Sequence, residues 1–173
     1  MNMTNNDILI RLRYALDIKN NDMVEIFQLG GIEVTKDEVL KILTKPKDYY
    51  EDDVDFDEIE EDDDHIECDN RMYESFLNGF ITFKRGKQEP KPGQPEFPAI
   101  TNEHANNLLL KKVKIALSLT SEDMLDILEE AGVTVTKGEM SAILRKKGHK
   151  NYKVCGDRYA RNFLKGLALK HRG

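Results

Sequence analysis

Positively charged residues gather near the end of the chain, with aromatic and imidazole side chains between them. The group consists of Arg145, Lys146, Lys147, His149, Lys150, Tyr152, Lys153, Arg158 and Arg161. Lys and Arg bind phosphate groups through charge and hydrogen bonds, and rings placed among them can stack on nucleic-acid bases. The pattern therefore predicts a surface that contacts an anionic partner, either nucleic acid or a protein. The alternative is that these charges only solvate a surface and attract an acidic segment of the same chain.

A second group of reactive side chains overlaps the first and indicates a different kind of site. His149, Tyr152, Cys155, Asp157 and Arg158 stand at the predicted start of the last helix. The first backbone N–H groups of a helix have no partner within it, so they can bind phosphate or carboxylate groups. These residues predict, as an alternative function, a small-anion or phosphate-ligand site in a binding protein or an enzyme.

The sequence contains no recognised catalytic motif, such as a phosphate-binding glycine loop, a nucleophile elbow or a zinc-protease helix. His65 and Cys68 have the spacing of one zinc-ligand pair, but zinc needs about four ligands, and the related segment near the end of the chain has Tyr152 in place of His65. Arginine follows Cys68 and Cys155 by three residues and would stabilise a thiolate, although a small buried thiol is the simpler interpretation. We expect no metal, no cofactor and, on balance, no catalysis.

The elements that position these residues come in two copies. Residues 15–45 align with residues 116–146 at a constant shift of 101, and about four positions in ten are identical. Residues 68–80 align with residues 155–167 at a shift of 87, so the first copy carries 14 extra residues between its halves. The chain is therefore two copies of one structural unit.

Each copy has the apolar spacing of about four amphipathic helices. In the second copy Leu109, Leu110, Val113 and Ala116 recur with the period of one buried helical face, and the first copy repeats the pattern. The sequence thus predicts an all-α fold of two homologous helical units of about four helices each, packed as a pseudo-symmetric pair.

Residues that begin and end helices recur in both copies. We expect the asparagine pairs to cap the first helices, glycines to end the second ones, and threonine–glutamate pairs to form capping boxes on the third. A glycine on the apolar face of each fourth helix predicts a close approach by a neighbouring helix. These residues are Asn5, Asn6, Asn106 and Asn107; Gly31 and Gly132; Thr35, Glu38, Thr136 and Glu139; Gly79 and Gly166.

The predicted domains are residues 1–83, a first repeat with the acidic insertion at about 51–64, and residues 105–173, a basic second repeat. Residues 84–104 form a linker that holds four of the five prolines, a composition typical of an extended connection. Each repeat alone is short enough for its core to be marginal, so we expect the two to pack against each other.

The net charge of −6 conceals two oppositely charged halves. Residues 1–83 carry −14 and residues 105–173 carry +7, and most of the negative excess lies in residues 48–69. Such a block usually stays solvated and flexible; the alternative is an intramolecular lid over a basic surface of the second repeat. With no apolar run of about 18 residues, we expect no membrane association and a cytoplasmic protein.

Taken together, the motifs resemble one known family. Both units begin with Asn-Asn and Ala-Leu, then have a glycine at a helix end and a threonine–glutamate cap, and close with Cys-x-x-Arg before Phe-Leu-x-Gly. In these motifs the chain is similar to the YehS-like bacterial proteins, whose domain has no known function. Residues 149–169 carry the most specific part of the resemblance. It implies a small cytoplasmic bacterial protein with duplicated helical units and implies no activity. The acidic segment is longer and more negative than the family's usual connection, so no role of that segment extends to the family.

Overall fold

The computed structural model describes residues 3–44, 65–87, 92–93, 95 and 97–172, and in this part of the chain it contains eight helices and no strand. The first unit comprises α1 (Asn5–Leu16), α2 (Asn20–Leu29), α3 (Lys36–Ile42) and α4 (Asn70–Arg85). The second comprises α5 (Ala105–Ala116), α6 (Ser121–Glu130), α7 (Lys137–Leu144) and α8 (Asp157–Arg172). The predicted all-α fold of two four-helix units is confirmed. The predicted acidic insertion, residues 51–64, lies outside the described residues.

The helix starts are set by different residues from those predicted for α1 and α5. Thr4 is the N-cap of α1 and forms a capping box with Asp7, and His104 is the N-cap of α5. The asparagine pairs stand inside the first helical turn, one and two residues after Thr4 in α1 and two and three residues after His104 in α5, so the prediction that they are caps is wrong. Their side-chain amides are used for tertiary hydrogen bonds instead.

The other predicted helix ends are largely confirmed. Thr35 and Glu38 form a capping box at α3, whereas at α7 only the Thr136 half of the box is present, because the Glu139 carboxylate accepts from the hydroxyls of Thr136 and Tyr159. Gly31 and Gly132 follow α2 and α6 with φ of 94° and 89°. These left-handed values favour glycine, which has no Cβ to clash.

The fourth helix of each unit packs directly on the second at a glycine. A Cβ added to Gly79 would lie 1.9 Å from the carbonyl oxygen of Ile26, and one added to Gly166 would lie 2.0 Å from that of Ile127. The two contacts are equivalent under the shifts of the repeat. The close approach predicted from the sequence is therefore confirmed in both units.

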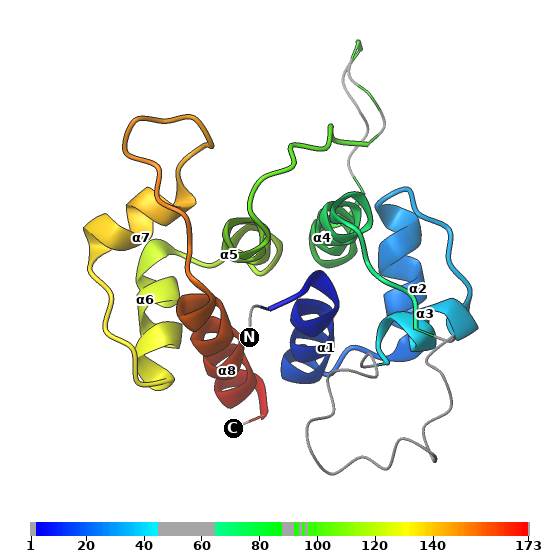
Figure 1. The fold of residues 1–173 in the computed structure, drawn as a ribbon, viewed down its shortest axis with the longest axis horizontal. Helices are drawn as coiled ribbons and strands as arrows, with labels where there is room; N and C mark the ends of the chain where they lie inside the picture. Colours follow the sequence, from blue (N-terminus) through cyan, green and yellow to red (C-terminus); the bar gives the residue numbers. More distant parts are fainter. Residues whose placement is uncertain (1–2, 45–64, 88–91, 94, 96, 173) are drawn as a thin grey trace, which may run out of the picture.

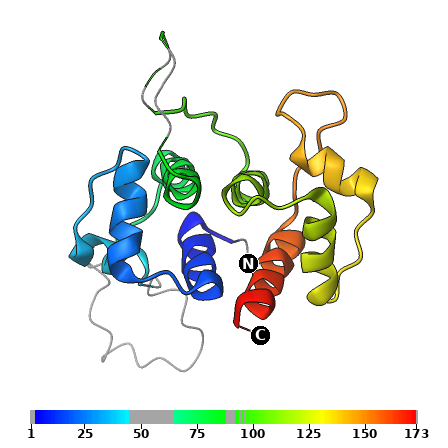
Figure 2. The ribbon, with the colours of Figure 1, turned by 180° about the vertical axis from the view of Figure 1, so that it is seen from behind.

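The two units pack so that the first helix of each lies against the last helix of the other. In Figures 1 and 2, α1 lies beside α8 and α4 beside α5, which the contacts between these helices confirm. In a two-fold interface each unit uses the same elements to contact the other, as these helices do. The buried apolar side chains of both units accordingly form one continuous core.

Two equivalent arginines close this interface. Arg172 at the end of α8 lies over the ring of Tyr14, 4.2 Å from its centroid, and its Nη1 is 3.7 Å from the carboxylate of Asp17. On the other side Arg85 at the end of α4 donates to the carbonyl of Ile115 (3.1 Å) and to Ser118 (3.4 Å). Because Ile115 and Ser118 are the repeat equivalents of Tyr14 and Asp17, the predicted pseudo-symmetric pairing extends to individual contacts.

Candidate anion-binding surface

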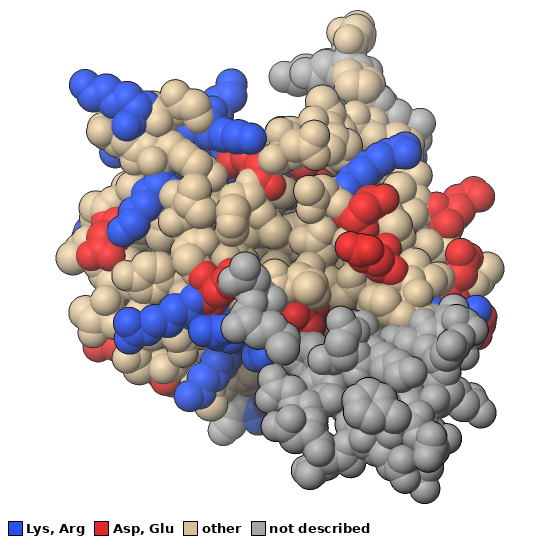
Figure 3. Space-filling model, viewed as in Figure 1, with Lys and Arg blue, Asp and Glu red and all other residues tan. Residues whose placement is uncertain are grey.

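The loop between α7 and α8, residues 145–156, carries most of the basic residues predicted to contact a partner. Figure 3 shows Lys and Arg gathered over the second unit on this face of the molecule. Arg145 and Tyr152 are half-buried. The other predicted residues are exposed: Lys146, Lys147, His149, Lys150, Lys153, Arg158 and Arg161. None of these seven side chains forms an ion pair with a described residue, so their charges are available to a partner.

Backbone hydrogen bonds give the loop a defined shape. The His149 N–H donates to the Lys146 carbonyl (3.0 Å), and the Tyr152 N–H donates to the His149 carbonyl (2.9 Å). The His149 ring is turned back on the loop, where its Nδ1 accepts from the Asn151 N–H at 3.0 Å. These two successive turns are held by the backbone and by the His149 ring, and the neighbouring Lys146 and Lys150 side chains stay exposed.

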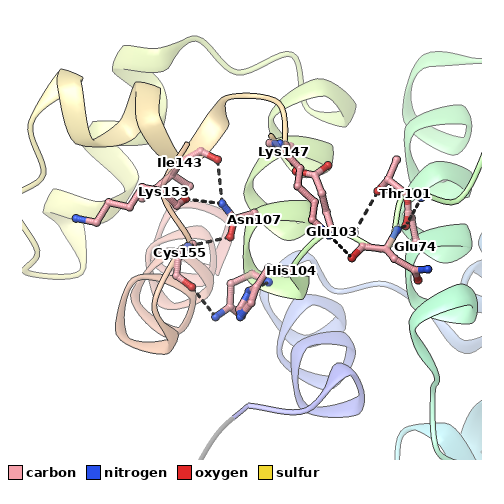
Figure 4. A network of polar contacts seen from close by, with 12 residues as sticks. Glu74, Thr101, Glu103, His104, Asn107, Ile143, Lys147, Lys153 and Cys155 are labelled. Carbon is pink, nitrogen blue, oxygen red and sulfur yellow. Dashed lines mark hydrogen bonds and ion pairs between the residues drawn. The ribbon is translucent and has the colours of Figure 1, made fainter. Parts of the chain in front are cut away.

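The base of the loop is fixed by Asn107, the second residue of its asparagine pair. Its amide nitrogen donates to the carbonyls of Ile143 (3.1 Å) and Lys153 (2.8 Å), and its oxygen accepts from the Cys155 N–H (2.8 Å). Figure 4 shows Asn107 between these segments. One buried side chain therefore joins the end of α7 to the approach to α8.

The first unit contains the same arrangement at the equivalent positions. Asn6 donates to the carbonyls of Ile42 and Ile66, both at 2.8 Å, and accepts from the Cys68 N–H at 2.9 Å. Sequence reasoning treated the asparagine pairs as caps and missed this role. The signal was present, because the asparagine pair recurs at the same position of both copies.

Tyr152 is less available to a partner than predicted. The Nζ of Lys111 lies 5.4 Å from the centroid of its ring, and Lys111 in turn forms an ion pair with Glu103. Burial, followed by the nearby charges of Glu103 and Cys155, raises the pKa of Tyr152. Since one face of the ring is covered by a lysine of its own chain, the cations around Tyr152 are better placed to bind an anion than the ring is to stack on a base.

The last residues of the linker form a strap between the basic loop and the first unit. The Glu74 carboxylate on α4 is fully buried and accepts from the Thr101 N–H (2.9 and 3.0 Å), the Thr101 hydroxyl (2.8 Å) and the Asn102 N–H (3.1 Å). At the other end of the strap Lys147 donates to the Asn102 carbonyl at 3.4 Å. Figure 4 shows Glu74, Thr101 and Lys147 in this network. The basic loop is therefore connected through the strap to α4.

The alternative site predicted at the start of α8 is not assembled as one constellation. The Asp157 carboxylate is occupied by Asn106 (2.8 Å) and by the Met3 N–H (3.2 Å), and the Asn106 hydrogen bond is the main reason why the pKa of Asp157 is lowered. Burial, and secondarily Asp157, raises the pKa of the Cys155 thiol to about 12. No hydrogen bond or ion pair between described residues links His149 or Tyr152 to Arg158. A protonated, buried thiol and an engaged carboxylate leave little chemistry for a ligand at this helix start.

Among the described residues there is no group of three or more His, Cys, Asp or Glu side chains placed to hold a metal ion. His65, which has zinc-ligand spacing from Cys68, has its Nδ1 2.7 Å from the Thr44 carbonyl. In the same part of the chain no helix has the length and apolarity needed to cross a membrane.

The fold and surface define a class of all-α protein in which the first helix of each of two homologous four-helix units packs on the last helix of the other, and the second unit presents a basic loop. This chain belongs to the family described as "Protein of unknown function (DUF1456)", whose pattern matches residues 5–86 and 106–173. It is 38% identical over 169 residues to the uncharacterized protein YehS of Escherichia coli (strain K12), over 97% of this chain and 96% of that protein. No solved structure matches it. The resemblance inferred from the sequence is thus confirmed.

Proposed function

We propose that the protein is a non-enzymatic binding module whose second unit contacts an anionic partner, nucleic acid, through the loop between α7 and α8. The contacting residues are Arg145, Lys146, Lys147, Lys150 and Lys153, with Arg158 and Arg161 at the start of α8. The observation that carries the proposal is that no Lys or Arg side chain of this surface forms an ion pair with a carboxylate of the described residues, although Asn106 and, less strongly, the nearby Arg161 lower the pKa of the Asp157 carboxyl. Charges compensated within the fold would have formed ion pairs with neighbouring carboxylates.

The difference between the two units supports the same conclusion. In each unit a buried asparagine joins the third helix to the residues before the fourth. The sequence between these two helices is basic in the second unit and acidic in the first. The fold therefore does not itself require the basic loop. A fixed loop that carries cations is suited to phosphate contacts, which depend on charge rather than on base identity.

The test is binding of a fluorescent single-stranded or duplex oligonucleotide to the full chain over a range of salt concentrations. Because bound phosphates release counterions, log Kobs should fall linearly with log salt. Changing Lys146, Lys147 and Lys150 together to Glu should weaken binding to all sequences alike. If all three contact duplex phosphates, the slope should become shallower by about 0.9 for each contact, or roughly 3 in total.

The matched control changes Arg11, Lys19 and Lys36 to Glu, an equal change of net charge on the first unit. These residues are exposed, and Lys19 makes only a surface ion pair with Asp17. The control should retain most of the affinity. Equal losses in both variants would show that binding depends on net charge and not on the loop, and would contradict the proposal.

A further inference from the structure

The linker covers one face of the first unit, and no linker residue among those that the structure describes covers the equivalent face of the second unit. On the first unit a Cβ added to Gly31 would lie 3.4 Å from the ring of Phe97, so the ring rests on this glycine. Four residues later Thr101 binds the buried Glu74 carboxylate. A non-helical segment thus runs from the end of α2 to α4 and is held at two points.

On the second unit both equivalent positions are present, and no described segment occupies them as the linker does on the first. Gly132 corresponds to Gly31, and apart from its chain neighbours no heavy atom of the described residues lies within 4 Å of a Cβ built there. Arg161 corresponds to Glu74. The exposure of α4 and α8 differs accordingly: Glu74 and Asn78 are 0% and 7% exposed, whereas their equivalents Arg161 and Lys165 are both exposed.

This face of α8 carries a hydrogen-bond donor where the equivalent face of α4 carries an acceptor. Glu74 accepts hydrogen bonds from backbone N–H groups, whereas a guanidinium at the same place can only donate and therefore needs an acceptor. Arg158 and Lys165 stand three residues before and four residues after Arg161, on one side of α8, and neither forms an ion pair with a described residue. Three exposed cations in a row favour a carboxylate-bearing occupant.

We propose that this face, defined by Gly132, Arg158, Arg161 and Lys165, is the docking surface for an extended acidic segment of a partner protein. The occupant would follow the path that the linker takes on the first unit, with an apolar side chain over Gly132 and a carboxylate on Arg161 about four residues further along. Glu129 and Glu130 end α6 just before Gly132 and disfavour a carboxylate at that point. The apolar requirement at Gly132 also favours a peptide over nucleic acid. This surface shares Arg158 and Arg161 with the surface proposed for nucleic acid, but it does not include the basic loop.

The linker itself supplies the probe. A labelled synthetic peptide of residues 94–103 that carries Thr101→Glu retains the Phe97 anchor and places a carboxylate where Arg161 would receive it. In fluorescence anisotropy with the full chain, we expect this peptide to bind at least about tenfold more tightly than the unsubstituted peptide. A second substitution, Phe97→Ala, should also weaken binding, because it removes the aromatic ring that would lie over Gly132.

Variants of the full chain distinguish this surface from the basic loop. Arg161→Glu should abolish the preference for the acidic peptide, whereas Arg11→Glu, an equal charge change at an exposed position of α1, should leave it intact. The Lys146, Lys147 and Lys150 triple variant should lose oligonucleotide affinity and keep peptide affinity. If Arg161→Glu and Arg11→Glu have equal effects, or if the triple variant also loses the peptide, the docking proposal is overturned. The second result would show instead that the loop binds any polyanion and would leave the proposed function standing.

Discussion

The side-chain amide of Asn107 satisfies three backbone groups, one in the last turn of α7 and two in the loop that follows, and its equivalent Asn6 satisfies the corresponding groups of the first unit. Asn107 is 0% exposed. Water cannot readily replace a lost partner in such a place, so the free-energy cost of losing the amide is the desolvation penalty of the stranded groups. In each unit, therefore, this asparagine joins the end of the third helix to the residues before the fourth helix through tertiary hydrogen bonds.

Replacing Asn107 by Ala should lower the free energy of unfolding by about 3 kcal/mol, since it strands one N–H and two carbonyls. Urea denaturation followed by circular dichroism would measure the change. The control is Asn162→Ala, whose amide donates only to the Arg158 carbonyl in its own helix. That change should alter stability by less than about 0.5 kcal/mol. Similar values for the two variants would argue against the role assigned to Asn107.

Both thiols should make the protein less stable in alkaline solution. Burial, with secondary effects of neighbouring acidic residues, raises the pKa of Cys68 and of Cys155 from 9.0 to about 12. Above pH 9 an unfolded thiol loses its proton while the folded one keeps it, so stability is complete below pH 9 and falls between pH 9 and about 12. Each thiol should contribute about 1.4 kcal/mol per pH unit to this loss.

The measurement is urea denaturation at several pH values from neutral upward, compared with a variant in which both cysteines are Ala. Burial, followed by the charges of Cys68 and Cys155, also raises the pKa of Tyr73, so replacing both thiols removes part of this shift as well as their own titration. The double variant should lose less stability with rising pH. Parallel curves for the two proteins would show that these thiols titrate normally when folded.

At the scale of helices, the contact between α6 and α8 depends on a residue with no side chain. Gly166→Ala should lower stability by about 3 kcal/mol although alanine favours helices, because its Cβ would lie 2.0 Å from the Ile127 carbonyl oxygen and must force the helices apart. Gly138→Ala in α7 is the matched control, since its nearest neighbour would be the Thr136 hydroxyl at 3.9 Å. This control should be neutral or stabilising by up to about 1 kcal/mol. Thermal or urea denaturation that ranked the two variants in the opposite order would contradict this account.

The sequence predicts the helices well, but it does not predict all of their caps or the distant hydrogen-bond partners of their polar residues. Apolar residues with helical spacing predicted about four helices in each unit, because each helix buries one face, and the structure has four in each. The caps of α1 and α5 were missed because asparagine favours both a cap and a buried hydrogen bond, and only the tertiary structure decides between them. Local sequence carries no information about a partner 36 or more residues away.

At the scale of the whole molecule, the sequence predicted that the basic residues would gather in one region but did not predict their connection to the first unit. The proline-rich composition indicates that the linker is extended, but it does not indicate that Thr101 and Asn102 bind Glu74. One indication was available: Glu74 lies within a buried run of α4 and its repeat equivalent is Arg161. A charge reversal at equivalent positions of a repeat indicates that the two positions have different surroundings.

The first helix of each unit packs on the last helix of the other, so the two units share one core. In the separated second unit, the face of α5 that packs on α4 and the face of α8 that packs on α1 would be exposed to water. The hydroxyl of the fully buried Tyr73 also donates to the Ala105 carbonyl across this interface, at 2.7 Å. Chains of this size bury too little apolar surface to be robust alone, so loss of the shared interface should be decisive.

We therefore expect residues 1–104 and residues 105–173, produced as separate chains, to be weakly helical alone and to form a stable one-to-one complex when mixed. Circular dichroism of the mixture should exceed the sum of the separate spectra, and analytical ultracentrifugation should give the mass of the full chain. In the mixture Arg85→Ala should weaken association, because its hydrogen bonds to Ile115 and Ser118 cross the interface. Lys36→Ala, an exposed residue of α3, is the control. Two fragments that each unfolded cooperatively, with no added helicity on mixing, would show that the units are independent domains and that their pseudo-symmetric contact contributes little to folding.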